Sequence, residues 1–248
     1  PKTDDAERRR VQAAFDRLFD VHEMSDIEVA TLLREREIDI AIDLNGYAGR
    51  GRPAILAHRP VPVQVNYLGY PGTMAAPFMD YLIADRVVIP ERNRRFFSEQ
   101  LVYMPHTYQP TDDTRPIAKH MTNRSEAGLP ESGFVFACFN ATRKIGPDIF
   151  DVWMRLLHGV GASVLWLIGD SPVTAANLKR EAAARGISPD RLVFAKPLPQ
   201  SEHLARLRLA DLFLDTLPYN AHTTASDALW AGLPVLTCPG ETFAARVA

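Results

Sequence analysis

The 248-residue chain has 46% hydrophobic and 23% charged residues, which is the ordinary composition of a globular protein. Its formal net charge of -2 supplies no general positive field, which argues against a nucleic-acid-binding protein and a membrane-surface protein. No apolar run reaches the roughly 18 residues of a membrane span. Cys138 and Cys238 lack zinc-ligand spacing, so we expect a cytoplasmic protein without a metal site, and the start at Pro1 suggests a piece of a longer chain.

The first part of the chain predicts two helices followed by short strands. Apolar residues recur at helical spacing within 4–20, and a second helical pattern over 25–39 begins at Ser25, a favourable capping residue. The period then changes to short apolar runs bounded by glycine, proline and asparagine, which are typical of buried parallel strands. These runs lie at 38–44, 63–69, 81–89 and 101–105.

A change in composition predicts a domain boundary near the middle of the chain. Residues 107–130 are polar and rich in proline and aspartate, as linkers between compact domains often are. We therefore expect a first domain over 1–115 and a second over 116–248, the second truncated at its end.

The second domain shows a regular alternation of strand and helix patterns. Apolar runs predict strands at 134–140, 163–170, 191–198, 212–218 and 234–240, with a helical pattern after each of the first four. This alternation predicts a Rossmann-like, doubly wound parallel sheet. Such sheets bind ligands at the carboxyl ends of their strands, so the residues that follow each strand are the candidates for a site.

The segment "PYNAHTTASDALWAG" (218–232) follows the fourth strand of this domain and leads into a helix. A helix that begins at Thr223 or Thr224 would present free amides beside His222, and such helix starts favour phosphate. The alternative is a plain threonine N-cap, with Asp227 as an acidic residue that complements the helix dipole in the first turn. The neighbouring histidine and the position after a parallel strand favour the phosphate site.

Two further residues follow strands of the same domain. Lys144 can neutralise a phosphate as a point charge, although a single loop lysine is often only solvated. His203 can lie against a base or a ribose, or can be a half-buried histidine of an amphipathic helix. The chain contains neither a dinucleotide-binding GxGxxG nor a P-loop, which argues against NAD and ATP as ligands.

Several separated motifs resemble one known family in order and spacing. They include "NYLGYPGT", "MDYLIAD", "RLVFAKPLPQSEHLARLRLADLFLDT", "NAHTTASDALWAGLPVLT" and "GETFAARVA". Together they resemble the catalytic region of the O-linked N-acetylglucosamine transferase family in its bacterial form, over roughly residues 38–248. The resemblance implies an α/β protein with two Rossmann-like domains of the B-type glycosyltransferase fold, the first of them incomplete here.

The resemblance also implies an activity. Members of this family move N-acetylglucosamine from UDP-GlcNAc to serine or threonine hydroxyls of proteins, with inversion and without a metal or other cofactor. The implied partners are a UDP-sugar donor and an acceptor protein, with tetratricopeptide repeats outside this segment. The residues that the family places near the acceptor hydroxyl fall outside these 248 residues, so no general base is expected here.

Carried over by position, the resemblance implies roles for ten residues. Lys144 would stabilise the leaving diphosphate with His222, Thr223 and Thr224, and Asp227 would bind the ribose. The remaining implied contacts are His203 and the backbone of Leu198 for uridine, Gln200 near the ribose, and Leu68 with Gly69 for the sugar. The family often has an amide side chain where Ala141 stands and a lysine where Gln200 stands, so the chain lacks two donors near the nucleotide.

Two other functions are compatible with these residues. One is a catalytically degenerate domain that binds a nucleotide or a protein partner without chemistry. The other is a protein O-fucosyltransferase that uses a GDP sugar, although the motif of that group near the turn lacks the HTTxxD arrangement. Binding of UDP or GDP would separate these readings.

Overall fold

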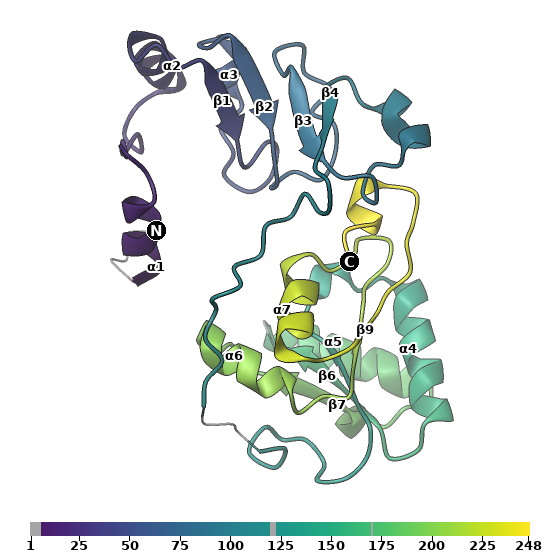
Figure 1. Cartoon of the computed structure of the whole chain (residues 1–248). Coiled ribbons are helices and arrows are strands. Elements are labelled where there is room, and N and C mark those ends of the chain that lie inside the picture. The colour runs from purple at the N-terminus through teal and green to yellow at the C-terminus, as the bar shows by residue number, and fades with distance from the viewer. Residues whose placement is uncertain (1–5, 120–122, 170) are drawn as a thin grey trace. The chain divides into compact units, whose positions relative to one another are not determined.

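The computed structural model describes residues 6–119, 123–169 and 171–248, and their contacts group the chain into two compact units (Figure 1). Unit 1 holds the chain up to Ile83 together with Phe96–Val102. Unit 2 holds Ala84–Arg95 together with Tyr103–Ala248. The domain boundary expected between residues 115 and 116 stays a prediction.

Unit 1 is built on a sheet of four short strands in the order β1-β2-β3-β4 (Figure 1). The strands are β1 Ile40–Asp43, β2 Val63–Asn66, β3 Tyr81–Ala84 and β4 Gln100–Tyr103. β1 pairs with β2, and β2 with β3, in parallel, as the apolar runs predicted. The run 81–89 stops early because the Asp85 carboxylate accepts the amides of Val87 and Val88 at 2.8 and 2.9 Å, which turns the chain.

The helices of unit 1 are α1 Ala6–Ala13, α2 Asp26–Glu35 and the short α3 Ala54–Ala57. The helix expected over 4–20 ends at Ala13, so its length was wrong. Its later apolar residues Phe15 and Leu18 are 57% and 55% exposed. A helix of this length is stable only when its apolar face packs against other residues. Phe15 and Leu18 are exposed, so they do not extend such a face.

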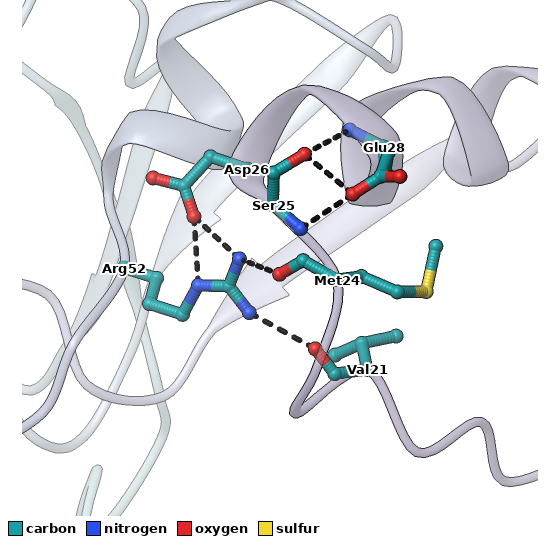
Figure 2. A network of polar contacts seen from close by, with 6 residues as sticks. All are labelled: Val21, Met24, Ser25, Asp26, Glu28 and Arg52. Carbon is teal, nitrogen blue, oxygen red and sulfur yellow. Dashed lines mark hydrogen bonds and ion pairs between the residues drawn. The ribbon is translucent and has the colours of Figure 1, made fainter.

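The start of α2 is fixed by two sets of polar contacts (Figure 2). Ser25 and Glu28 form a capping box, in which the serine oxygen accepts the Glu28 amide and the glutamate accepts the Ser25 amide. Arg52 donates to the Asp26 carboxylate at 2.7 Å and to two backbone carbonyls of the preceding turn. The predicted cap at Ser25 is therefore confirmed, and the arginine ties α2 to the segment before α3.

Unit 2 contains a five-stranded sheet in the order β7-β6-β5-β8-β9, with all four neighbouring pairs parallel. The strands are β5 Val135–Cys138, β6 Val164–Ile168, β7 Leu192–Ala195, β8 Leu212–Leu214 and β9 Val235–Leu236. The chain starts in the central strand, moves to one edge, then returns to the other side. This order confirms the predicted doubly wound Rossmann-like sheet.

The helices of unit 2 are α4 Pro147–Gly159, α5 Pro172–Ala184, α6 Gln200–Leu207 and α7 Thr223–Ala231. α6 and α7 pack against each other, as Figure 1 shows. The core of the unit is large and apolar, and its largest fully buried side chains include Trp153, Trp166 and Phe213. No helix in the described part of the chain has the length and apolarity needed to span a membrane.

Candidate functional site

The candidate site lies where the chain leaves β5 and β8, which are neighbours in the sheet of unit 2. After β5 comes a short 3-10 helix, Thr142–Lys144. After β8 the chain runs through residues 215–222 into α7. Because both strands are parallel, these segments emerge at the same edge, as the sequence predicted.

Lys144 reaches the segment that precedes α7. Its Nζ donates to the backbone carbonyl of Asn220 at 2.8 Å and lies 4.3 Å from the centre of the Tyr219 ring. Burial lowers the pKa of Lys144, while Asp215 acts in the opposite direction. The ammonium is thus held beside the start of α7 by a carbonyl and an aromatic face, and it keeps donor capacity for a further acceptor.

The start of α7 differs from the plain threonine cap that was the alternative reading. The N-cap is His222, it makes no side-chain capping bond, and Thr223 is the first helical residue. Thr224 donates its hydroxyl hydrogen to the Asn140 side-chain oxygen. The threonine N-cap reading was therefore wrong, and the first amides of α7 have no acceptor within the helix.

The structure places a half-buried imidazole at this helix start. His222 stacks on Tyr219 with ring centres 5.0 Å apart, and its Nε2 is buried without a hydrogen-bond partner in the described residues. Burial, helped by Lys144, lowers the pKa of His222 to about 4, although a hydrogen bond to the Ala244 carbonyl acts in the opposite direction. At neutral pH His222 is therefore an uncharged imidazole, and its Nε2 has no partner among the described residues.

A buried network that the sequence did not suggest holds the 215–222 segment in place. One oxygen of Asp215 accepts the amides of Thr216 and Ala221 at 2.7 and 2.6 Å and the Asn140 side-chain amide at 3.2 Å. Its other oxygen accepts the Thr237 hydroxyl at 2.6 Å. Asn140 also donates to the Thr216 hydroxyl at 2.8 Å. This network fixes the carbonyl that Lys144 binds.

A second group of side chains forms around His203 on α6. The guanidinium of Arg206 donates from Nε to His203 Nδ1 at 3.0 Å, and Phe139 meets the imidazole edge-on at 5.3 Å. Because arginine only donates, Nδ1 must accept, and neutral His203 carries its proton on Nε2. Burial and then Arg206 lower the pKa of His203 to about 4. His203 therefore offers a neutral N–H donor.

Leu198 borders this group. It lines a cavity of about 390 Å³ together with Trp166, Phe194, Lys196 and Arg206. Arg206 donates to the Lys196 carbonyl, and burial lowers the pKa of its guanidinium to about 10. The cavity joins an apolar wall to charged and polar groups, which is the usual composition of a ligand pocket.

Asp227 does not lie in the first turn of α7, where the alternative interpretation placed it. It lies beyond the first turn of α7, which contains no acidic residue, so it does not complement the helix dipole there. Its carboxylate pairs with the guanidinium of Arg115, and it acts electrostatically on His203. The dipole reading was wrong, and Asp227 lies next to the His203 group.

Most of the predicted residues thus fall into two groups within unit 2. The first group consists of Lys144, His222, Thr223 and Thr224. His203, Leu198 and Asp227 belong to the other, and Gln200 is the exposed first residue of α6. Leu68 and Gly69 lie in unit 1, where Leu68 has a φ of 75° and a Cβ on Gly69 would lie 2.2 Å from the Leu44 carbonyl oxygen. Their assignment to a sugar pocket stays a prediction.

Sequence reasoning missed Asn140, Asp215, Tyr219, Arg206 and Arg115. Tyr219 stands directly after the predicted strand 212–218, so its position was a usable signal, whereas Asp215 lies within that predicted strand. Arg115 had no such signal, because its partner Asp227 is 112 residues away.

Comparison with known proteins places these features in a family. Glycosyl transferase family 41 matches residues 1–127 and 109–248. The probable UDP-N-acetylglucosamine–peptide N-acetylglucosaminyltransferase SEC of Arabidopsis thaliana is 40% identical over 97% of this chain and 25% of its own length. The UDP-N-acetylglucosamine–peptide N-acetylglucosaminyltransferase of Caenorhabditis elegans is 27% identical over 89% of this chain and 29% of its own length.

Among solved structures, a lysine-to-methionine variant of the Thermobaculum terrenum O-GlcNAc transferase superposes with a TM-score of 0.87. It is 35% identical, and the match covers 99% of this chain and 46% of that one. This similarity confirms the expected B-type glycosyltransferase fold. The chain spans about a quarter of the length of the curated relatives named above. With the sequence match, the shared fold and a polar site at the carboxyl edge of a doubly wound sheet, the chain belongs to glycosyl transferase family 41.

Proposed function

We propose that this chain forms the donor-binding side of an enzyme that moves N-acetylglucosamine from UDP-GlcNAc to serine or threonine hydroxyls of proteins. The observation that carries the proposal is the position of Lys144 beside the start of α7. Its ammonium donates to the carbonyl of Asn220, two residues before the N-cap. The names of the relatives supply the donor and the peptide acceptor.

The arrangement suits a departing diphosphate. Breaking the bond between the sugar carbon and the phosphate oxygen leaves negative charge on the diphosphate. A fixed ammonium and free helix amides aimed at that charge lower the barrier, because they need not reorganise during the reaction. We propose that Lys144, His222, Thr223 and Thr224 make these contacts and that Asp227, His203, Gln200 and Leu198 bind the nucleoside.

The finer features of the reaction belong to the same proposal. The acceptor hydroxyl attacks the sugar carbon from the face opposite the diphosphate, which inverts its configuration. The hydroxyl proton passes to a base that we do not assign to this chain. Positive groups of the protein offset the phosphate charge, so we propose that no metal is needed, and that the enzyme acts in the cytoplasm.

Calorimetry with UDP and GDP, followed by a transfer assay with the full-length protein, tests the proposal. We expect UDP to bind more tightly than GDP and labelled N-acetylglucosamine to appear on an acceptor protein. UDP binding without transfer would favour a degenerate binding domain, and preferential GDP binding would favour a GDP-sugar transferase. Failure to bind either nucleotide would reject a nucleotide-dependent function.

Chelation tests the metal independence. The transfer rate should be unchanged after treatment with excess EDTA and removal of the chelator by gel filtration. A rate that falls after treatment and returns with added Mg²⁺ or Mn²⁺ would contradict this part of the proposal.

A further inference from the structure

Arg115 has a deeply buried charged side chain beside the candidate nucleoside group. It belongs to the polar segment that precedes β5, yet its side chain is only 8% exposed. Arginine is rarely buried to this degree unless its charge and its donors are satisfied. The partners of each nitrogen therefore indicate what the residue does.

Two of the three guanidinium nitrogens have partners. Nη1 contacts the Asp227 carboxylate on α7, and Nε donates to the Asp112 carbonyl at 3.1 Å. The guanidinium carbon lies 5.5 Å from the Trp230 ring centre, and the Trp230 indole donates to the Arg115 carbonyl at 3.1 Å. Arg115 is thus held on several sides in one position.

The third nitrogen, Nη2, is buried and has no hydrogen-bond partner among the described residues. A buried donor without an acceptor is destabilising, and more so for a charged group. Native structures seldom keep such a group unless a water or a ligand completes it. Its neighbour Asp227 is the residue for which we propose a ribose contact.

The chemistry of a ribose fits this pair of side chains. Each hydroxyl of a sugar can donate one hydrogen bond and accept two. A carboxylate can only accept, so Asp227 alone satisfies the hydroxyl hydrogens but not the hydroxyl lone pairs. A guanidinium nitrogen in the same place supplies the missing donor in a fixed direction.

We propose that Arg115 is a specificity-determining residue for the donor: Nη1 orients the Asp227 carboxylate, and Nη2 donates to a hydroxyl of the ribose. This inference rests on the proposed function, because it requires a nucleotide at the site. It goes further by assigning a direct contact to a residue outside the sheet and helix motifs. The pair then distinguishes a ribonucleotide from a nucleotide that lacks a ribose hydroxyl.

Binding of UDP, 2′-deoxy-UDP and 3′-deoxy-UDP to the full-length protein and to Arg115→Gln tests the assignment by calorimetry. The wild type should prefer UDP over at least one deoxy analogue by about tenfold or more. Arg115→Gln should weaken UDP by a similar factor, leave the binding of that analogue nearly unchanged, and so remove the preference. Arg185→Gln, which breaks an ion pair with Asp151, is the matched control. This variant should keep the wild-type preference for UDP over the deoxy analogue.

Equal weakening of UDP and both analogues by Arg115→Gln would overturn the inference, because it would show a purely structural role. Unchanged UDP binding would overturn it as well. Thermal unfolding shows whether the variant is folded. If it is not, Arg115→Lys takes its place, since it keeps the charge beside Asp227 without the planar fork. If the wild type binds no UDP at all, the proposed function itself fails, which is a separate outcome.

Discussion

The two groups of candidate residues in unit 2 each contain a half-buried neutral histidine, but the hydrogen-bond partners of the two rings differ. The buried Nε2 of His222 has no hydrogen-bond partner among the described residues, and the Lys144 ammonium helps to lower the pKa of the ring. His203 accepts from Arg206 at Nδ1 and therefore carries a hydrogen on Nε2. The two rings have similarly lowered pKa values but offer different groups to a ligand: His203 a fixed N–H donor, and His222 a nitrogen without a partner.

This contrast suggests a division of the site. The Lys144 group combines an ammonium, free helix amides and an imidazole that can take up a proton, which suits a diphosphate. The His203 group combines a neutral N–H, an aromatic ring and a nearby cavity, which suits a nucleoside. Variants in the two groups should therefore affect different parts of the same ligand.

The largest expected effect is at Lys144. Lys144→Ala should lower the turnover number of the full-length enzyme by about 10²–10³-fold, because it removes a fixed donor to the developing diphosphate charge. Its unfolding free energy should change by about 1 kcal/mol or less, since one hydrogen bond to a carbonyl is lost. Lys179→Ala, which removes a contact with the Phe194 ring, is the control. A rate equal to that of the wild type would remove Lys144 from the mechanism.

Asp215 should matter for stability as well as for binding. Asp215→Asn leaves one acceptor oxygen where two oxygens now accept four hydrogen bonds, so we expect unfolding to become easier by about 2–4 kcal/mol. Urea unfolding measures this change. The control is Asp151→Asn, whose ion pair with Arg185 is partly exposed, so its loss should lower the free energy of unfolding much less. Equal losses in the two variants would show that the network does not hold the segment.

The variant His203→Phe should show that the two groups bind different parts of the nucleotide. We expect it to weaken UDP binding by about tenfold, because the Nε2 hydrogen is lost, while the affinity for inorganic pyrophosphate stays unchanged. Lys144→Ala should weaken both ligands. Competition calorimetry measures all four affinities. A loss of pyrophosphate affinity in His203→Phe would mean that the groups do not divide the ligand in this way.

The smallest expected effect is a proton taken up when the donor binds. The pKa of His222 is about 4 in the folded protein, so the ring is neutral near pH 6. A phosphate beside Nε2 raises that pKa, and we expect an uptake of about 0.5–1 proton on binding UDP-GlcNAc at pH 6. Calorimetry in buffers with different ionisation enthalpies measures the uptake. The proton uptake should disappear in His222→Asn and persist in His203→Phe. If the wild type gives the same heat of binding in every buffer, no proton is taken up and the assignment to His222 is contradicted.

The same lowered pKa values make the stability of the folded protein depend on pH. A histidine with a folded pKa of about 4 and an ordinary unfolded pKa binds its proton more readily in the unfolded chain. The stability from His203 and His222 is therefore fully present above pH 6.5 and is lost as the pH falls toward 4.

The strands of unit 2 could be predicted because each is a short apolar run followed by turn residues. Their ends could not, since side chains stop them: the run 212–218 leaves the sheet at Leu214, where Asp215 draws two loop amides to its carboxylate. The first helix was predicted too long because periodicity alone does not show whether an apolar face has a partner.

The candidate site was predictable only where the residues follow strands. Lys144, His203 and the 222–224 turn could be chosen on that ground, but Arg115 and Asn140 could not. Arg115 meets Asp227 across 112 residues, and Asn140 meets Thr216 across 76, so only the folded sheet brings them together. The tautomer of His203 likewise depends on its contact with Arg206, which sequence patterns do not specify.

A crystal structure of the full-length protein with UDP tests the central claim most directly. The account predicts diphosphate oxygens within hydrogen-bond distance of Lys144 Nζ and of the first amides of α7, with the ribose against Asp227 and Arg115. A nucleotide bound elsewhere, or a diphosphate that contacts neither Lys144 nor the start of α7, would contradict it.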